Sequence, residues 1–141
     1  MQEEAAAGEP IYLELADTLE LYAAIIDATP ERAADYLRDR GALEGALGRP
    51  RSYAHYEEAD LALQATVLAH GIAESQAFID ANKRLALVAM LTFLELNGFR
   101  VEASDPELAD WILNFAAGTT PQELAPCATR SCGADMVDLP L

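Results

Sequence analysis

The sequence is short of basic residues, of cysteines and of long apolar runs. It holds 9 lysine and arginine residues against 24 aspartate and glutamate residues, a formal net charge of −15 over 141 residues. Because clustered cations bind phosphate backbones and anionic lipids, this balance argues against direct binding of nucleic acid and against a membrane partner. No run approaches the roughly 18 apolar residues that cross a bilayer. The acidic residues 1–10 do not resemble a signal peptide, so we expect a cytoplasmic protein.

The two cysteines, Cys127 and Cys132, lie close together near the end of the chain. Two cysteines are too few for a disulfide scaffold, and no histidine or second cysteine pair completes a zinc set. We interpret them as incidental thiols, with a disulfide between them as the alternative.

Helix-forming residues dominate, and 52% of the chain is hydrophobic, which is enough for one packed core. Capping residues followed by proline, as at Thr29-Pro30 and Asp105-Pro106, mark helix starts. We therefore predict an all-α fold, a compact bundle of about six to seven helices. The predicted helices cover about 16–28, 30–40, 42–48, 58–74, 81–97, 106–117 and 121–125, with a loop or small hairpin near 49–56.

The segment from Leu85 to Leu94 is apolar on every face, so we predict that 81–97 is the central, buried helix. Its first turn nevertheless carries Arg84 and Lys83, the only lysine in the chain, although cations at a helix start oppose the helix dipole. Free backbone N–H groups at a helix start bind anions, which favours a phosphate group held by both side chains. The alternative is that both cations point outward and pair with surface acids.

Asp80 directly precedes this helix. Its carboxylate suits two roles: it could cap the helix by accepting backbone N–H bonds, or it could bind Mg²⁺ on a nucleotide. The two roles compete for the same oxygen atoms, and the residues alone leave both open.

The stretch Gln76-Ala77-Phe78-Ile79-Asp80-Ala81-Asn82-Lys83-Arg84 resembles the active-site signature of the Fic/Doc (Fido) family, His-x-Phe-x-Asp/Glu-Gly/Ala-Asn-Lys-Arg. Residues 43–50 resemble the Leu-Glu-x-Ala-Leu-x-x-Pro element of the family's Doc, or death-on-curing, branch. The resemblance covers about residues 11–125. Residues 1–10 are then an acidic N-terminal extension and residues 126–141 an irregular C-terminal tail.

The resemblance implies a toxin of a toxin–antitoxin system. Family members transfer a phosphoryl or AMP group from ATP to a hydroxyl of a target protein, which in the Doc branch is elongation factor Tu. It also implies a small antitoxin as partner, and a flap near 49–56 that docks the target through Arg51, Tyr53 and His55.

By the same resemblance, Asp80 would hold Mg²⁺ and the following residues would bind the phosphates of ATP. The catalytic residues would be Gln76, at the family's histidine position, with Asp80, Lys83 and Arg84. The phosphate-binding residues would be Ala81, Asn82, Lys83 and Arg84.

Gln76 is the departure from the family pattern, because the family's base at this position is histidine. An amide can hydrogen-bond a hydroxyl but cannot accept its proton at neutral pH, and losing a base costs about 10²–10⁴ in rate. Phosphoryl transfer depends largely on positioning and electrostatics, so Gln76 could still orient the nucleophile. The alternative is a catalytically degenerate domain that binds nucleotide or a partner peptide without turnover.

Neither histidine is expected to replace the missing base. We predict that His70 packs within a helix and that His55, which lies between Tyr53 and Tyr56, belongs to a surface aromatic cluster.

Overall fold

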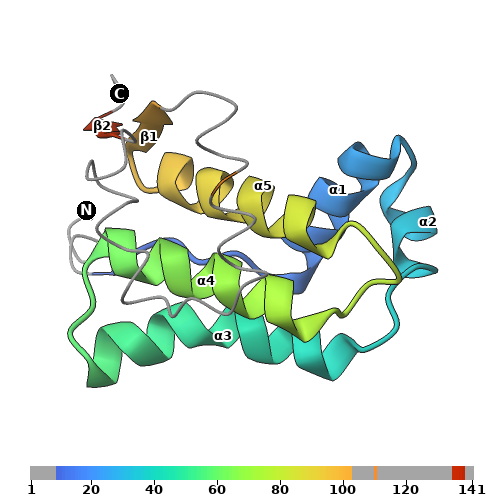
Figure 1. The fold of residues 1–141 in the computed structure, drawn as a ribbon, viewed down its shortest axis with the longest axis horizontal. Coiled ribbons are helices and arrows are strands. Elements are labelled where there is room, and N and C mark those ends of the chain that lie inside the picture. Colours follow the sequence, from blue (N-terminus) through green and yellow to red (C-terminus); the bar gives the residue numbers. More distant parts are fainter. Residues whose placement is uncertain (1–8, 103–109, 111–134, 139–141) are drawn as a thin grey trace.

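The computed structural model describes residues 9–102, 110 and 135–138 (Figure 1). Its helices are α1 (Leu15–Ile26), α2 (Pro30–Ala34), α3 (Arg40–Tyr56), α4 (Leu61–Ser75) and α5 (Asn82–Leu96). Two short strands, β1 (Phe99–Glu102) and β2 (Asp135–Asp138), follow. The predicted all-α class is confirmed. The helices predicted over 106–117 and 121–125 lie outside the described residues, except for Asp110.

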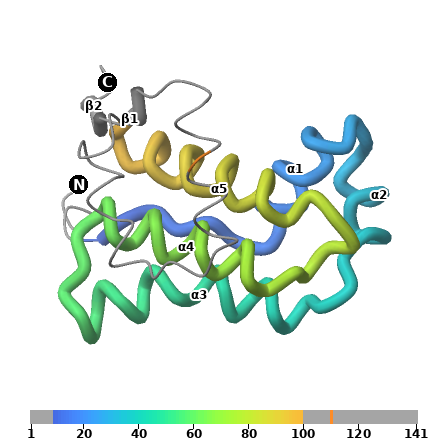
Figure 2. The backbone as a smooth tube through the Cα atoms, in the orientation of Figure 1, coloured from blue at the N-terminus to red at the C-terminus, as the bar shows by residue number. Residues whose placement is uncertain are grey.

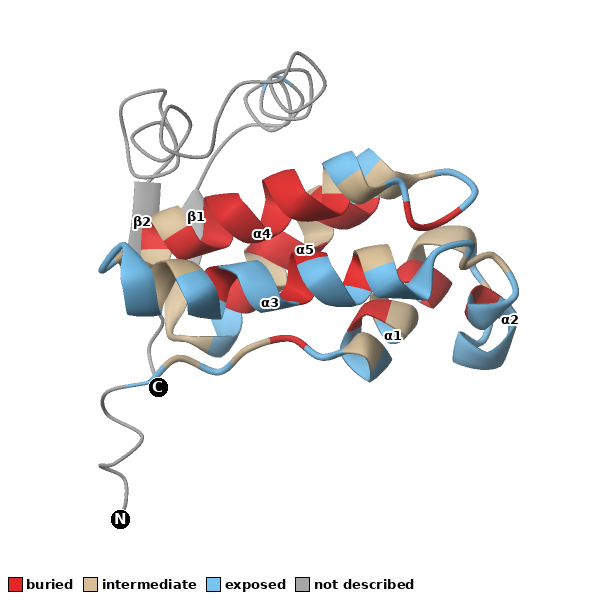
Figure 3. Cartoon of the chain, turned by 90° about the horizontal axis from the view of Figure 1, so that it is seen from below, coloured by how far each residue is buried: buried red, intermediate tan, exposed pale blue. Residues whose placement is uncertain are grey.

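The middle of the bundle is α4, which lies between α3 and α5 (Figures 1 and 2). Ten of its fifteen residues are buried, and Figure 3 shows the buried colour along most of its length. Small residues allow α3 to approach α4 closely, since a Cβ on Gly71 would meet the Ala46 Cβ at 3.2 Å. Among the described helices, α4 is therefore the most deeply buried, and α5, which covers the helix predicted over 81–97, packs directly against it.

One face of α5 is fully buried and the opposite face is only partly covered by the described residues. The buried side chains are Leu85, Ala86, Ala89, Met90, Phe93 and Leu94. Leu87, Val88 and Leu91 are partly exposed, although the sequence there is apolar all round. The predicted burial of this helix is thus seen on the face that carries Leu85, Ala86, Ala89, Met90, Phe93 and Leu94.

The loop or hairpin predicted near 49–56 is wrong, because these residues are the last turns of α3. Pro50 lies inside that helix and removes one backbone hydrogen bond. The helix continues through it because Leu43, Ala46, Leu47 and Pro50 form one buried face. Burial of this face outweighs the tendency of proline to end a helix.

The helix predicted over 30–40 is also too long, since α2 ends at Ala34. Asp39 instead caps α3 by accepting a hydrogen bond from Ala42 N at 3.0 Å. The segment between them pairs with the loop after α4, through an isolated bridge between Leu37 and Phe78. Tertiary contacts with a distant loop therefore end this helix early.

The two strands pair antiparallel, with Phe99 opposite Asp138 and Glu102 opposite Asp135. Residues 135–138 are thus ordered as a strand within the tail that we predicted to be irregular. A four-residue strand carries too little periodicity to be recognised from sequence. Among the described residues, no helix combines the length and the apolar character needed to span a membrane.

Candidate nucleotide site at the start of α5

The loop from Gln76 to Ala81 joins the two buried helices and carries the signature. Gln76 ends α4 in the left-handed conformation (φ 46°), and Ala81 begins α5 in the same conformation (φ 62°). Neither residue is glycine, so each position costs free energy, of order 1–3 kcal/mol. Such a loop persists only where the surrounding contacts fix it.

The segment between α2 and α3 supplies part of these contacts. Arg38 N donates to Ala77 O at 2.7 Å, and Ile79 N donates to Tyr36 O at 3.0 Å. The Arg38 guanidinium donates to Gln76 O at 3.2 Å. The backbone of the residue at the family's base position is therefore held from outside its own helix.

Asn82 fastens the same loop from the side of α5. Its Oδ1 accepts from Phe78 N at 3.0 Å and its Nδ2 donates to Phe78 O at 2.9 Å. Because both ends of the amide are occupied by the loop backbone, the group that Asn82 offers to a phosphate is its backbone N–H. The predicted phosphate contact and this clamp are thus compatible.

Tyr22 of α1 supports the loop from the core. Its ring stacks on Phe78, with centroids 3.9 Å apart and planes 11° from parallel. Its hydroxyl donates to Asp80 Oδ1 at 2.9 Å and lies 3.1 Å from Asp80 O. Burial, together with the hydrogen bond to the Asp80 carboxylate, raises the pKa of Tyr22 to about 12. Tyr22 therefore stays a neutral donor at physiological pH.

The alternative in which Asp80 caps α5 is wrong. The N-cap residue is Ala81, and no side chain makes a capping hydrogen bond there. Asp80 is exposed, Tyr22 occupies Oδ1, and within the described residues Oδ2 has no hydrogen-bond or ion-pair partner. One carboxylate oxygen is thus fixed and the other is open to a ligand.

Lys83 and Arg84 are exposed, and neither pairs with an acid among the described residues. They line a cavity of about 810 Å³, the α5 cavity, together with Gln76, Asp80, Ala81 and Asn82. The first N–H groups of α5 have no intrahelical acceptor. Two unpaired cations, uncapped N–H groups and a half-free carboxylate therefore share one hollow, which suits an anion that carries a metal ion.

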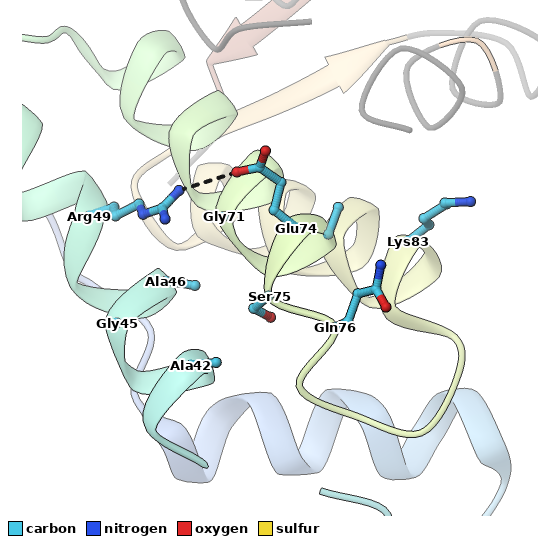
Figure 4. A pocket seen from close by; sticks show the side chains of 10 residues that line it. Ala42, Gly45, Ala46, Arg49, Gly71, Glu74, Ser75, Gln76 and Lys83 are labelled. Atoms are coloured by element: carbon cyan, nitrogen blue, oxygen red, sulfur yellow. Dashed lines mark ion pairs between the residues drawn. The ribbon is translucent and has the colours of Figure 1, made fainter. Parts of the chain in front are cut away.

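A second cavity, of about 710 Å³, opens between α3 and α4, and we call it the α3–α4 cavity (Figure 4). It shares Ala73, Gln76 and Lys83 with the α5 cavity. Glu74 lies on its wall, 3.8 Å from the Arg49 guanidinium and 3.4 Å from His70 Nδ1. The side chain of Gln76 thus stands where two adjoining cavities meet.

The predicted docking residues lie elsewhere. Arg51, Tyr53 and His55 belong to the last turns of α3, at the end of the bundle opposite the signature loop (Figure 1). The Arg51 guanidinium lies 4.6 Å from the Tyr12 ring centroid, and His55 packs edge-on against Tyr56 at 4.5 Å. Target docking by these residues stays a prediction, but the structure does not bring them together with Gln76.

A family model described as "Fic/DOC family" matches residues 12–94, which is more than half of the chain. The chain belongs to the Fic/DOC family. The matched range contains the whole signature loop, both adjoining cavities and nearly all of α5. The resemblance inferred from the signature is thus confirmed.

Two curated relatives of this Fic/DOC chain are informative. It is 32% identical over 104 residues to a protein named Toxin Doc from Mycolicibacterium smegmatis, with 72% of each chain covered. It is 40% identical over 83 residues to Protein kinase doc of Escherichia phage P1, with 58% of this chain and 65% of that protein covered. Both relatives carry Doc names, in agreement with the predicted branch.

Sequence patterns did not point to Tyr22, Arg38, Arg49 or Glu74 as part of this region. His70 and Glu74 have the i, i+4 spacing of a helical pair, so that contact had a local signal. Tyr22 and Asp80 are 58 residues apart, and Arg38 and Gln76 are 38 apart. Pairs of this kind appear only once the helices are packed.

Proposed function

We propose that this chain is a Doc-like toxin that transfers a phosphoryl group from ATP to a hydroxyl of a target protein, with Mg²⁺. The relatives named Toxin Doc and Protein kinase doc support this proposal. The observation that carries it is the placement of Lys83 and Arg84, which pair with no acid in the described part of the chain, beside the uncapped start of α5 and the Asp80 oxygen that Tyr22 leaves open.

Nucleotide binding follows from the α5 cavity. Its volume of about 810 Å³ lies within the range of small-molecule sites. Lys83 provides a point charge, Arg84 a planar fork, and the backbone N–H groups of the first turn complete the anion site. Together they hold and orient the phosphates and oppose the charge that spreads over them during transfer.

The residues present fit a Mg²⁺ ion that arrives with the nucleotide. Among the described residues, no group of three or more histidine, cysteine, aspartate or glutamate side chains could hold a metal. One open carboxylate, on Asp80, suits an ion that keeps several waters and binds phosphate oxygens. When bound, this ion would neutralise phosphate charge, while Tyr22 keeps the Asp80 carboxylate in one orientation.

Elongation factor Tu is the proposed target, and a small antitoxin the proposed partner, by analogy with the Doc branch. The chain's net charge of −15 favours a partner segment with basic residues. The α3–α4 cavity adjoins the α5 cavity at Gln76 and Lys83, so a target hydroxyl entering there would meet the end of the bound phosphates.

Gln76 favours a second candidate, a degenerate domain that binds nucleotide or a partner peptide without turnover. Its amide cannot take a proton from the target hydroxyl. On the proposed function it orients the hydroxyl instead, from the junction of the two cavities.

ATP labelled separately at the α and γ positions distinguishes these functions. Purified chain is incubated with elongation factor Tu or a bacterial lysate, with Mg²⁺ or with EDTA. Protein-bound γ label supports phosphoryl transfer, and α label supports AMP transfer instead. Saturable binding of Mg-ATP without label on any protein selects the degenerate domain that binds nucleotide. Absence of ATP binding contradicts the transferase and leaves only the degenerate domain that binds a partner peptide.

A further inference from the structure

The two adjoining cavities offer few groups that could take up a proton. Among their described lining residues, the titratable acceptors are the carboxylates of Asp80 in the α5 cavity and Glu74 in the α3–α4 cavity. Lys83, Arg84 and Arg49 are cations, and Gln76 and Ser75 are poor proton acceptors. Among the described lining residues, the candidates for a base are therefore these two carboxylates.

Asp80 is committed elsewhere. Tyr22 occupies its Oδ1, and on the proposed function its other oxygen faces the metal. It also lies in the cavity assigned to the nucleotide, on the side of the phosphates rather than of the acceptor. On the proposed function, the Asp80 carboxylate binds the metal ion on the ATP phosphates. It is therefore poorly placed to deprotonate the target hydroxyl.

Glu74 lies on the cavity proposed for the target hydroxyl, which Asp80 does not line. Its side chain is about half exposed (53%) on the wall of the α3–α4 cavity, two residues before Gln76. Arg49 from α3 and His70 from the preceding turn of α4 flank the carboxylate at 3.8 and 3.4 Å. Figure 4 shows it between Arg49 and Lys83, on the same cavity as Gln76. A base oriented by neighbouring groups is the arrangement that activates hydroxyl nucleophiles.

The histidines do not compete for this role. The His70 side chain is only 10% exposed and lines none of the cavities described above. His55 belongs to the other end of α3. The residue that the packing presents to an incoming hydroxyl is thus Glu74.

Resting on the proposed function, we propose that Glu74 is the general base that replaces the family's histidine. The hydroxyl oxygen of the target forms a bond to the γ-phosphorus of ATP as the bond from that phosphorus to the β,γ-bridging oxygen breaks. ADP leaves with that oxygen, and the hydroxyl proton passes to a carboxylate oxygen of Glu74 and then to solvent. Gln76 orients the hydroxyl through its amide, and Arg49 holds Glu74 in place.

A double-mutant cycle between positions 74 and 76 tests this assignment. Transfer of γ label to elongation factor Tu, or to the labelled lysate protein, is measured for wild type, Glu74→Gln, Gln76→His and the double variant. Glu74→Gln is expected to slow the wild type by about 100-fold or more, the usual loss of a positioned base. In the Gln76→His background the same change is expected to cost less than about fivefold, since imidazole then takes the proton.

Glu44→Gln is the matched control. Glu44 also lies on the surface with a 53% exposed side chain and pairs with an arginine, Arg40, at 3.3 Å. It lines neither the α5 cavity nor the α3–α4 cavity, so its variant should transfer at the wild-type rate.

Calorimetric binding of Mg-ATP should be unchanged in Glu74→Gln, because Glu74 does not line the α5 cavity.

The outcomes separate this inference from the proposed function. An equal loss from Glu74→Gln in both backgrounds, or no loss in the wild type, overturns the role of Glu74 as base. Transfer by Gln76→His but not by the wild type also overturns it, while leaving the nucleotide site intact. Absence of transfer from every variant, Gln76→His included, overturns the proposed function itself.

Discussion

The hydroxyl of Tyr22 lies 2.9 Å from Asp80 Oδ1 and 3.1 Å from the Asp80 carbonyl oxygen. One buried phenol on α1 therefore orients both the side chain and the backbone of the residue proposed to meet the metal. The same ring stacks on Phe78 of the signature. Tyr22 thus links the core to the candidate site.

Tyr22→Phe keeps the stack and removes the hydrogen bond. We expect about a tenfold loss of Mg²⁺-dependent ATP affinity, as is typical when a group that orients a metal ligand is removed. Calorimetric titrations in Mg²⁺ and in EDTA measure it. Tyr36→Phe is the control, because the Tyr36 ring packs near the Tyr22 ring, with centroids 6.1 Å apart, but among the described residues its hydroxyl makes no hydrogen bond to Asp80. Equal losses in Mg²⁺ and EDTA would point to general damage instead.

The pKa of Tyr22 gives a prediction at alkaline pH. Its value in the fold, about 12, is raised above the 10.0 expected in the unfolded chain. The neutral form is thus favoured by folding, so this contribution to stability is complete below pH 10 and is lost as the pH rises toward 12. Chemical denaturation of wild type and Tyr22→Phe at pH 9 and pH 11.5 should show a larger drop for the wild type. Parallel drops would contradict the assignment.

Lys83→Glu should separate stability from binding. An acid at the start of α5 interacts favourably with the helix dipole, so we expect a gain of about 0.3–1 kcal/mol in the free energy of unfolding. The same change places an anion where the phosphates bind, so ATP affinity should fall beyond detection. Thermal unfolding and calorimetry measure the two effects, with Lys83→Gln as the neutral control. A variant that binds ATP like the wild type would contradict the site.

Asn82→Ala removes both hydrogen bonds to the Phe78 backbone. We expect a loss of about 1–3 kcal/mol in the free energy of unfolding, measured by urea denaturation, together with weaker ATP binding. Asn97→Ala is the matched control. Asn97 fastens Ile11 at the far end of α5 through two similar bonds, so its variant should lose stability and keep ATP affinity. Equal effects of both variants on ATP would argue against a local role for the clamp.

Local signals account for what could be predicted from the sequence. Thr29 and Pro30 start α2, Gly98 follows the end of α5 with φ 91°, and the run from Ala81 to Arg84 marks the candidate anion site. Each of these rests on residues within one turn of each other. The helix class and the candidate phosphate-binding residues could therefore be read before any packing was known.

The remainder depends on contacts between distant segments. Helix α3 continues past Pro50 because its buried face packs against the rest of the bundle. Helix α2 ends early because residues 36–39 pair with the signature loop. Asp80 does not cap α5, and its carboxylate instead accepts a hydrogen bond from Tyr22, 58 residues away. The contact between Glu74 and Arg49 could not be predicted either, because it joins α4 to α3.

The most direct test of the account is an amide chemical-shift titration of the ¹⁵N-labelled chain with Mg-ATP. The largest shifts are predicted at the backbone N–H groups of Asn82, Lys83 and Arg84, saturating at one nucleotide per chain. They should disappear in a Lys83→Ala, Arg84→Ala double variant that keeps the rest of the spectrum. Shifts confined to the last turns of α3, around Arg51 and His55, or no shifts at all, would contradict a nucleotide at the start of α5.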